Sequence, residues 1–372
     1  MKKLRVGVIY GGRSGEHEVS LASAASVFKN LDPERYDAVP IKIEKDGRWT
    51  LPPEPPKTMK AADVIKGAIG SSERRAREAH LVAQPGGDTL MTVTDGAVSG
   101  LALDVVFPVL HGPYGEDGTV QGLLELANVP YVGAGVLASA VGMDKAAMKL
   151  ALAAKGLPIC DYDVVMKRDW QRDERRVLQQ VVNHLGFPVF VKPANLGSSV
   201  GISKAKHVAE LRKAISFAAE FDRKVVVEAA VPHAREIEVA VLGNDAPEAS
   251  VPGEIIPSKE FYDYEAKYLD GASRDVIPAD LPAELSDRIR ALAVAAFAAV
   301  DCAGMARVDF LLDGESGSLF LNEVNTIPGF TTISMYSKMW AASGLAYPAL
   351  IDRLIALAIE RHADKQQLRT SM

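Results

Sequence analysis

The chain has 372 residues, of which 48% are hydrophobic and 24% are charged, and its formal net charge is −6. These values are ordinary for a globular protein, and the length predicts roughly two or three domains. The negative net charge argues against a general nucleic-acid-binding protein. Because no stretch approaches the ~18 uninterrupted apolar residues of a membrane-spanning helix, we also expect no membrane contact.

Two features of the sequence indicate the compartment in which the protein works. The N-terminus, MKKLRVGVIYGG, has an apolar run of strand length with no small-residue cleavage site after it, unlike a signal peptide. Cys160 and Cys302 are too few for a disulfide framework, which favours a reducing compartment. We therefore expect a cytoplasmic protein.

The first part of the chain has the pattern of an α/β domain. Leu4 to Tyr10 is rich in Val and Ile, a glycine turn follows, and Glu18 to Leu31 has helical spacing. The turn is not the G-x-G-x-x-G pattern of a dinucleotide site. Ligands bind at the carboxyl ends of strands in such sheets, so we expect an acid of the Glu16-His17-Glu18 segment to face that edge. Nothing in the spacing of these residues supports a metal site there.

Two further strands are predicted before residue 140, where the first domain should end. They cover Ala38 to Ile43 and Asp104 to Leu110, and the second leads into the loop HGPYGEDG. His111, at the start of that loop, could either cap it or face a substrate, and the sequence leaves both open. Residues 70–100 mix charges, glycines and short apolar runs, which predicts an elaborated sheet edge or a long insertion.

The middle of the chain predicts a second unit with a loop that is rich in hydrogen-bond donors. Lys145 lies in the first turn of an amphipathic helix, Asp144 to Lys155. A strand, Phe187 to Lys192, precedes the loop PANLGSSVG, whose N–H groups could surround phosphate oxygens. An ordinary hairpin turn is the alternative. The P-loop pattern G-x-x-x-x-G-K-[ST] is absent, so a nucleotide site here would be of another type.

A tyrosine-rich polar loop, Glu260 to Tyr268, follows two further strands at residues 222–230 and 235–242. Three tyrosines within this loop could form a packed cluster at the surface. The alternative is a lid that excludes water from reactive intermediates.

The stretch from Met305 to Ser334 predicts a β-hairpin with a polar face. With the turn centred on Ser316, Asp309 lies opposite Glu323 and Arg307 lies opposite Asn325. Side chains alternate with a period of two, so these four share one face, next to Leu311 and Leu321. Carboxylate and amide oxygens on a rigid face suit a hard cation such as Mg²⁺, and an arginine beside them suits a phosphate or an oxyanion. The alternative is a solvated face with a surface ion pair.

Several of these stretches together resemble the D-alanine–D-alanine ligase family of the ATP-grasp superfamily. The matching pieces, in the order of the family, are GGRSGEHEVS, HGPYGEDGTVQG, MDK, KPANLGSSVG, YDYEAKY, MARVDF and NEVNTIPGFT. The resemblance implies an α/β fold with a Rossmann-like N-terminal domain at 1–140 and α+β ATP-grasp domains at 141–232 and 233–372. It also implies ATP-dependent joining of two D-alanines through an acylphosphate, for peptidoglycan precursor synthesis.

The resemblance assigns roles residue by residue. Asp309, Glu323 and Asn325 look like ligands for Mg²⁺ or Mn²⁺, with a pair of ions bridged by Glu323, and Arg307 looks like the group that stabilises the transferring phosphoryl and the oxyanion. The residues that resemble nucleotide contacts are Lys145, Lys192, Ser199, Glu228, Glu236 and Lys267. Those that resemble contacts to the two substrates are Glu16, Ser198, Tyr268, His111 and Ser334. Ala229 departs from the lysine that many members carry there.

Two other functions are alternatives to the joining of two D-alanines. A D-alanine–D-lactate ligase usually lacks the EAKY segment, which is intact at Glu265 to Tyr268. A non-catalytic ATP-binding protein is expected to have lost Arg307 or a metal ligand, and none is lost. We expect D-alanine and ATP as small-molecule partners and a homodimer as the assembly.

Overall fold

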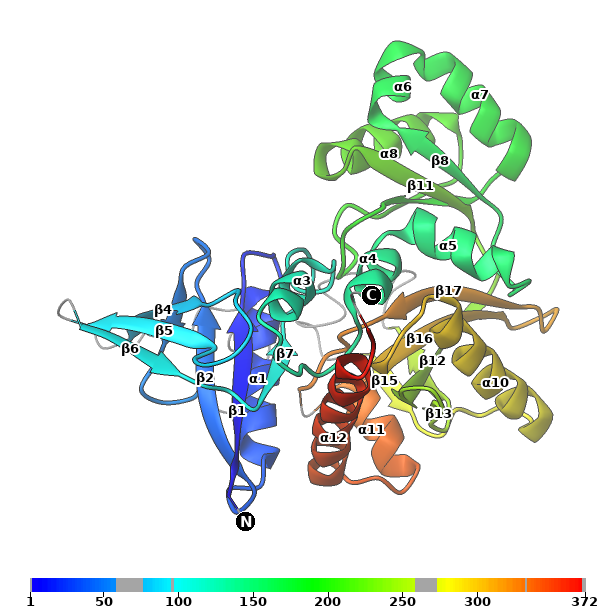
Figure 1. Cartoon of the computed structure of the whole chain (residues 1–372). Helices are drawn as coiled ribbons and strands as arrows, with labels where there is room; N and C mark the ends of the chain where they lie inside the picture. The colour runs from blue at the N-terminus through cyan, green and yellow to red at the C-terminus, as the bar shows by residue number, and fades with distance from the viewer. Residues whose placement is uncertain (1, 58–75, 95–96, 258–272, 332, 370–372) are drawn as a thin grey trace.

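The computed structural model of the chain describes residues 2–57, 76–94, 97–257, 273–331 and 333–369. Within these residues the strands form three sheets, each with helices packed against it. Figure 1 shows the first and third sheets in the lower part of the view with α12 between them, and the second sheet above. The fold is the predicted α/β combination.

The first sheet has a parallel centre and an antiparallel extension. Its strand order is β6-β5-β4-β3-β2-β1-β7, with β1 parallel to both β2 and β7. Because β1 and β7 are covered on both faces, their sequences are continuous apolar runs rather than alternating ones. The extension, β4 to β6, is the elaborated edge expected between residues 70 and 100. The bounds are β1 Leu4–Gly11, α1 His17–Asn30, β2 Tyr36–Ile43, β3 Trp49–Leu51, β4 Arg77–Leu81, β5 Leu90–Thr94, β6 Ala97–Leu101, β7 Val105–Val109, α3 Thr119–Leu126 and α4 Val136–Met143.

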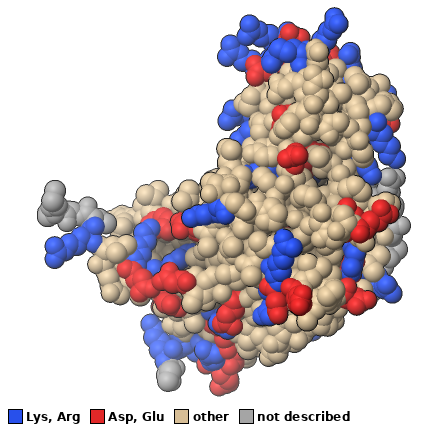
Figure 2. Space-filling view, turned by 90° about the vertical axis from the view of Figure 1, so that its right-hand side faces the viewer, with Lys and Arg blue, Asp and Glu red and all other residues tan. Residues whose placement is uncertain are grey.

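The second sheet is antiparallel and is drawn from one continuous stretch of chain. Its strand order is β10-β9-β11-β8, and α7 and α8 pack their apolar stripes on it. The bounds are α5 Lys145–Ala154, β8 Tyr162–Met166, α6 Lys167–Arg172, α7 Glu174–Leu185, β9 Val189–Pro193, β10 Ser203–Ala205, α8 Val208–Phe221 and β11 Lys224–Ala229. In Figure 2 basic side chains gather over the top of this unit, where α6 and α7 carry Lys167, Arg168, Arg172, Arg175 and Arg176.

The third sheet is also antiparallel and contains the predicted hairpin. Its strand order is β15-β14-β12-β16-β17, with β13 paired to β12. The bounds are β12 Ala234–Gly243, β13 Glu248–Ala249, β14 Gly253–Ile256, β15 Arg274–Val276, α10 Ala283–Ala299, β16 Gly304–Asp313, β17 Leu319–Asn325, α11 Met335–Ala342 and α12 Tyr347–Gln366.

A shared core joins the first and third units. Val8 and Phe107 of the first sheet belong to the same buried cluster as Leu350 and Leu354 of α12. Each such side chain, fully buried, contributes about 2 kcal/mol of hydrophobic stabilisation. Arg361 of α12 adds a hydrogen bond of 3.0 Å from Nη2 to the Tyr131 carbonyl oxygen. The two units are therefore held as one body, whereas the domain boundaries near residues 140 and 232 stay a prediction.

The register of the hairpin follows the expected pairing only as far as Asp309. Arg307 pairs with Asn325 and Asp309 with Glu323, as predicted. A β-bulge between Asp309 and Phe310 then shifts the register, so that Phe310 pairs with Leu321. The expectation that Leu311 and Leu321 share the polar face is therefore wrong. Leu321 points into the core, and the bulge leaves an extra residue, Asn322, beside Glu323.

The length and apolar composition of the helices bear on whether any of them could cross a membrane. Among the described helices, no single one is both long and apolar enough to do so. Helices α11 and α12 meet the length and composition criteria only as a pair, and they are bent by 104° at their break.

Candidate active site

A cleft with a volume of ≈ 990 Å³ lies where the three sheets meet. It is lined by every predicted site residue that the structure describes: Glu16, His111, Lys145, Lys192, Ser198, Ser199, Glu228, Glu236, Arg307, Asp309, Glu323, Asn325 and Ser334. Lys267 and Tyr268, predicted on the tyrosine-rich loop, lie outside the described residues. Residues that are far apart in the sequence thus converge on one concave surface.

The polar face of the hairpin forms one wall of the cleft. Arg307 donates two hydrogen bonds to Asp309, of 2.8 Å from Nε and 2.7 Å from Nη2, and its Nε lies 3.2 Å from Glu238 Oε2. Asn325 Nδ2 donates to Asp309 Oδ2 at 2.9 Å and to Glu323 Oε1 at 3.4 Å. Burial alone would lower the pKa of Arg307, but Asp309 and Glu238 outweigh it and hold that pKa well above its ordinary value.

Carboxylates gather around Arg307 on this wall. They belong to Asp309, Glu238 and Glu323. Carboxylate and amide oxygens are the donors that hard divalent cations prefer. The donor set therefore fits Mg²⁺ or Mn²⁺.

Another part of the cleft places Glu16 against the glycine-rich loop. Ser198 Oγ donates a hydrogen bond to Glu16 Oε1. The approach is close, because a Cβ on Gly112 would lie 2.8 Å from Glu16 Oε2 and one on Gly197 would lie 2.9 Å from the same atom. A side chain at either position would displace the Glu16 carboxylate from its place beside Ser198.

The loop itself is held by the helix that follows α4. Lys145 Nζ donates to the Leu196 carbonyl oxygen at 2.7 Å. Ser198 and Ser199 have φ angles of 51° and 59°, in the left-handed region that non-glycine residues rarely adopt. Two successive residues of this kind turn the loop over the cleft.

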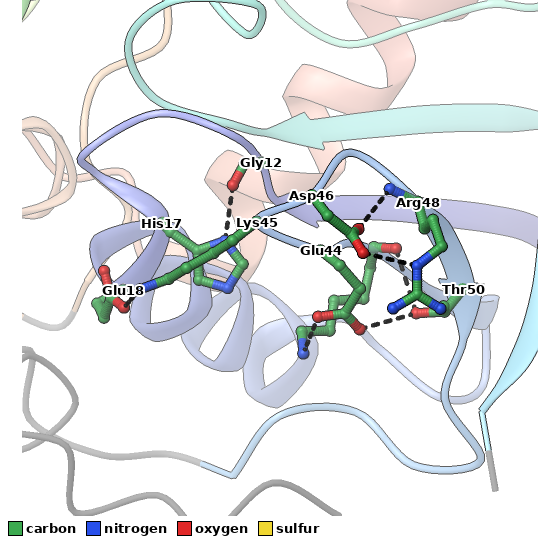
Figure 3. Close-up of polar contacts among 9 residues, drawn as sticks. Gly12, His17, Glu18, Glu44, Lys45, Asp46, Arg48 and Thr50 are labelled. Carbon is green, nitrogen blue, oxygen red and sulfur yellow. Dashed lines mark hydrogen bonds and ion pairs between the residues drawn. The ribbon is translucent and has the colours of Figure 1, made fainter. Parts of the chain in front are cut away.

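The position of Glu16 is set by the start of α1. Gly11 N donates to Ser20 Oγ at 2.7 Å, and Ser20 Oγ donates to the Val109 carbonyl oxygen, so α1 is fixed to the carboxyl ends of β1 and β7. Figure 3 shows the neighbouring contacts, in which His17 Nδ1 lies 2.7 Å from the Gly12 carbonyl oxygen and Lys45 pairs with Glu18 at 2.5 Å. The turn after β2 therefore contacts α1 through the ion pair of Lys45 with Glu18.

His111 uses both of its ring nitrogens within the protein. Nδ1 lies 3.1 Å from the Ile327 carbonyl oxygen, and Nε2 lies 3.2 Å from Ser23 Oγ, which also accepts from Phe330 N. Burial lowers the pKa of His111, although Glu16 acts in the opposite direction, so the ring is neutral at pH 7. In this arrangement His111 fixes the segment after β17 against α1.

Comparison with known proteins adds an independent observation. Residues 5–134 match the family model described as D-ala D-ala ligase N-terminus, and residues 151–356 match the one described as D-ala D-ala ligase C-terminus. The chain belongs to the D-alanine–D-alanine ligase family. As a member of this family it is an ATP-dependent ligase with an ATP-grasp fold, as the sequence predicts.

Relatives of this ligase match it along almost the whole chain. The D-alanine–D-alanine ligase of Thermoanaerobacter pseudethanolicus is 50% identical over 366 residues, which cover 98% of this chain and 99% of that protein. The solved D-alanine-D-alanine ligase of Coxiella burnetii is 39% identical with a TM-score of 0.83, covering 99% of this chain and 97% of that one. The VanG D-Ala:D-Ser ligase of Enterococcus faecalis is 34% identical with a TM-score of 0.82, covering 96% and 100%.

Sequence reasoning missed three residues at the ligase cleft. Glu116 accepts from Gly112 N at 2.6 Å, and burial, with Glu16 nearby, raises its pKa to about 8. Asn322 Oδ1 accepts from Lys192 Nζ at 3.2 Å because the bulge points it into the cleft. Glu238 faces Arg307. The acids of the HGPYGEDG loop and of β12 were visible signals, whereas the bulge left no sign in the sequence.

The far end of the ligase cleft is built from buried charges. Lys192 Nζ lies 2.5 Å from Glu228 Oε2.

At the mouth of the cleft, Ser334 Oγ accepts from Thr331 N at 2.9 Å and lies 2.8 Å from Thr331 Oγ1, which fixes the loop before α11. Glu236 also lines this cleft, on β12.

Proposed function

We propose that this cleft joins two D-alanines into D-alanyl-D-alanine at the expense of ATP, through an acylphosphate of the first D-alanine. One observation carries the proposal. The Glu16–Ser198 pair and the Arg307–Asp309 wall come from different units of the chain, yet both line one cleft. An acid and a cation in one cleft suit a zwitterion whose carboxylate is to be phosphorylated.

The first D-alanine is held by its ammonium group. Glu16 accepts from the ammonium, and Ser198 orients the Glu16 carboxylate through the hydrogen bond that it already makes. Tyr268 of the YDYEAKY motif is proposed as the third member of this group from the sequence alone. Glu16 is available to the substrate because it lines the cleft.

Phosphoryl transfer depends on fixed positive charge more than on a nucleophilic side chain. Arg307 stabilises charge on the transferring group and on the oxyanion that forms when the second amine attacks. Asp309, Glu323 and Asn325 would hold a pair of Mg²⁺ or Mn²⁺ ions, which supply further positive charge to phosphate oxygens when bound. Arg307 then exchanges part of its contact with Asp309 for contact with the substrates.

The remaining contacts are divided between the nucleotide and the second substrate. Glu228 and Glu236 are proposed to bind the adenine and the ribose. The proposed phosphate contacts are Lys145, Lys192, Ser199 and Lys267. Ser334 receives the carboxylate of the second D-alanine, and His111 supports the reacting carboxylate by fixing the residues around Ile327.

A phosphate-release assay tests the function directly. Purified protein with ATP and Mg²⁺ should release phosphate with D-alanine, and the dipeptide should appear in equal amount. L-Alanine alone should give no release above background. Mixtures of D-alanine with D-lactate or with D-serine show which second substrate competes, and mainly depsipeptide or D-alanyl-D-serine at neutral pH would overturn the proposal.

Assembly and location form part of the same proposal. The protein is proposed to act as a homodimer, which sedimentation velocity would measure. The buried cysteines Cys160 and Cys302 are both free, in agreement with a cytoplasmic protein.

A further inference from the structure

Lys149 is a buried lysine that has no part in the proposed reaction. It lies on α5, one turn after Lys145, and only 1% of its side chain is exposed. Its Nζ is 3.2 Å from Glu228 Oε1 and 5.4 Å from the centre of the Tyr162 ring. It does not line the cleft, whereas Lys145, Lys192 and Glu228 do. Lys149 is therefore placed behind Glu228, as seen from the cleft.

Glu228 faces two lysines, one more than a neutral pair requires. Glu228 is 4% exposed, and its two oxygens face different lysines, Oε1 facing Lys149 and Oε2 facing Lys192. The pair of Glu228 with Lys192 would be neutral without Lys149. Burying a further ammonium costs several kcal/mol unless it is compensated. A second lysine is therefore not explained by the need to pair Glu228.

The second lysine, Lys149, affects the charge that Lys192 presents to the cleft. With Glu228 facing Lys192 alone, the carboxylate would cancel most of the field of that ammonium in the cleft. With Lys149 behind it, Glu228 is already compensated, and the charge of Lys192 acts on whatever anion enters.

We propose that Lys149 is a positioning residue for nucleotide binding, which compensates Glu228 from behind and leaves the charge of Lys192 available to the phosphates of the nucleotide. The inference rests on the proposed function, since it takes Lys192 as a phosphate contact. A merely structural lysine would instead support the base and the phosphates alike. The two roles differ in which part of the nucleotide loses affinity when the charge is removed.

The experiment compares ADP with adenosine, which has the base and the ribose but no phosphate. Dissociation constants of both are measured by calorimetry in the same Mg²⁺ buffer for the wild type and for Lys149→Met. This variant keeps the length of the side chain and leaves the neutral Glu228–Lys192 pair in place, so it should fold. Lys155→Met, an exposed lysine at the end of the same helix, is the matched control.

The ratio of the adenosine constant to the ADP constant is the decisive readout. In Lys149→Met it should fall about tenfold or more, because the ADP constant rises while the adenosine constant changes little. Adding Glu228→Gln should restore most of the ratio, since a neutral amide no longer cancels Lys192. Lys155→Met should leave the ratio unchanged.

Two results would overturn the inference, and a third concerns its basis. An unchanged ADP constant in Lys149→Met would show that the charge has no such role. Equal losses for ADP and adenosine would show a structural role only. If the wild type bound neither ligand, the proposed nucleotide site would be wrong, and that failure is distinct because it precedes any comparison of variants.

Discussion

Replacing Arg307 with glutamine should unmask the repulsion among the carboxylates of the hairpin wall. In the metal-free protein the change removes both hydrogen bonds to Asp309 and the ion pair with Glu238. Removing one partner of a buried charge pair costs roughly 3–5 kcal/mol. Because 19% of the Arg307 side chain is exposed, we expect the lower end, about 3 kcal/mol. Bound Mg²⁺ should return much of this loss, since it replaces the missing positive charge.

Urea unfolding, followed by circular dichroism with EDTA and with saturating Mg²⁺, measures both effects. Arg353→Gln is the matched control, because its partner Glu248 is a surface residue and such pairs contribute about 0–1 kcal/mol. Mg²⁺ at about 100 times its dissociation constant for the wild type stabilises that protein by about 2.7 kcal/mol, and the same Mg²⁺ concentration should stabilise Arg307→Gln by more. A loss no greater than that of the control, or an equal gain from Mg²⁺ in both proteins, would refute the reasoning.

Four further substitutions test other residues of the cleft. Glu323→Gln and Asp309→Asn should each lower turnover by orders of magnitude in a fold that survives, and near-normal turnover at low Mg²⁺ would contradict this. Burial raises the pKa of Glu228, but the two lysines facing it dominate and lower that pKa to about 2. The stabilisation from the Glu228 carboxylate is therefore present above the pKa of the unfolded state, near 4.5, and is lost as the pH falls towards 2. The difference in unfolding free energy between the wild type and Glu228→Gln should shrink by about 3 kcal/mol over that range. Parallel plots of unfolding free energy against pH for the two proteins in acid would argue against this prediction. For Glu116 the dependence has the opposite sign, because burial and Glu16 raise its pKa to about 8. The wild type should therefore lose stability as the pH rises from 4.5 to about 8, and the stability of Glu116→Gln relative to it should rise over that range and level off above it. Parallel stability curves over this range would show that the carboxyl is ionised in the folded protein.

The alternation of side chains predicts the hairpin wall well, because strand geometry is local. The pairs Arg307–Asn325 and Asp309–Glu323 follow from a turn position and a period of two. The same rule fails at the next residue. A bulge between Asp309 and Phe310 places Asn322 in the cleft and pairs Phe310 with Leu321, both of which are buried in one cluster.

Contacts between units could not be predicted from residue patterns. Glu16 and Ser198 are separated by 182 positions, and only the family resemblance placed both at one substrate. Lys149 shows the opposite difficulty. A lysine on an amphipathic helix is ordinarily solvated. Nothing in the spacing from Lys145 reveals that Glu228, on a distant strand, provides a partner for it in the interior.

The shared core of the first and third units has a consequence for synthesis of the chain on the ribosome. Val8 and Phe107 emerge early, yet their cluster is completed only by Leu350 and Leu354. Domains generally fold as units during translation, N-terminal first. Here the stretch from β8 to β11 contains its whole sheet and can fold as soon as it leaves the exit tunnel. The first sheet is synthesised earlier, but one of its apolar faces stays exposed to solvent until α12 has been synthesised and packs on it. During that interval it is the segment that most needs a chaperone.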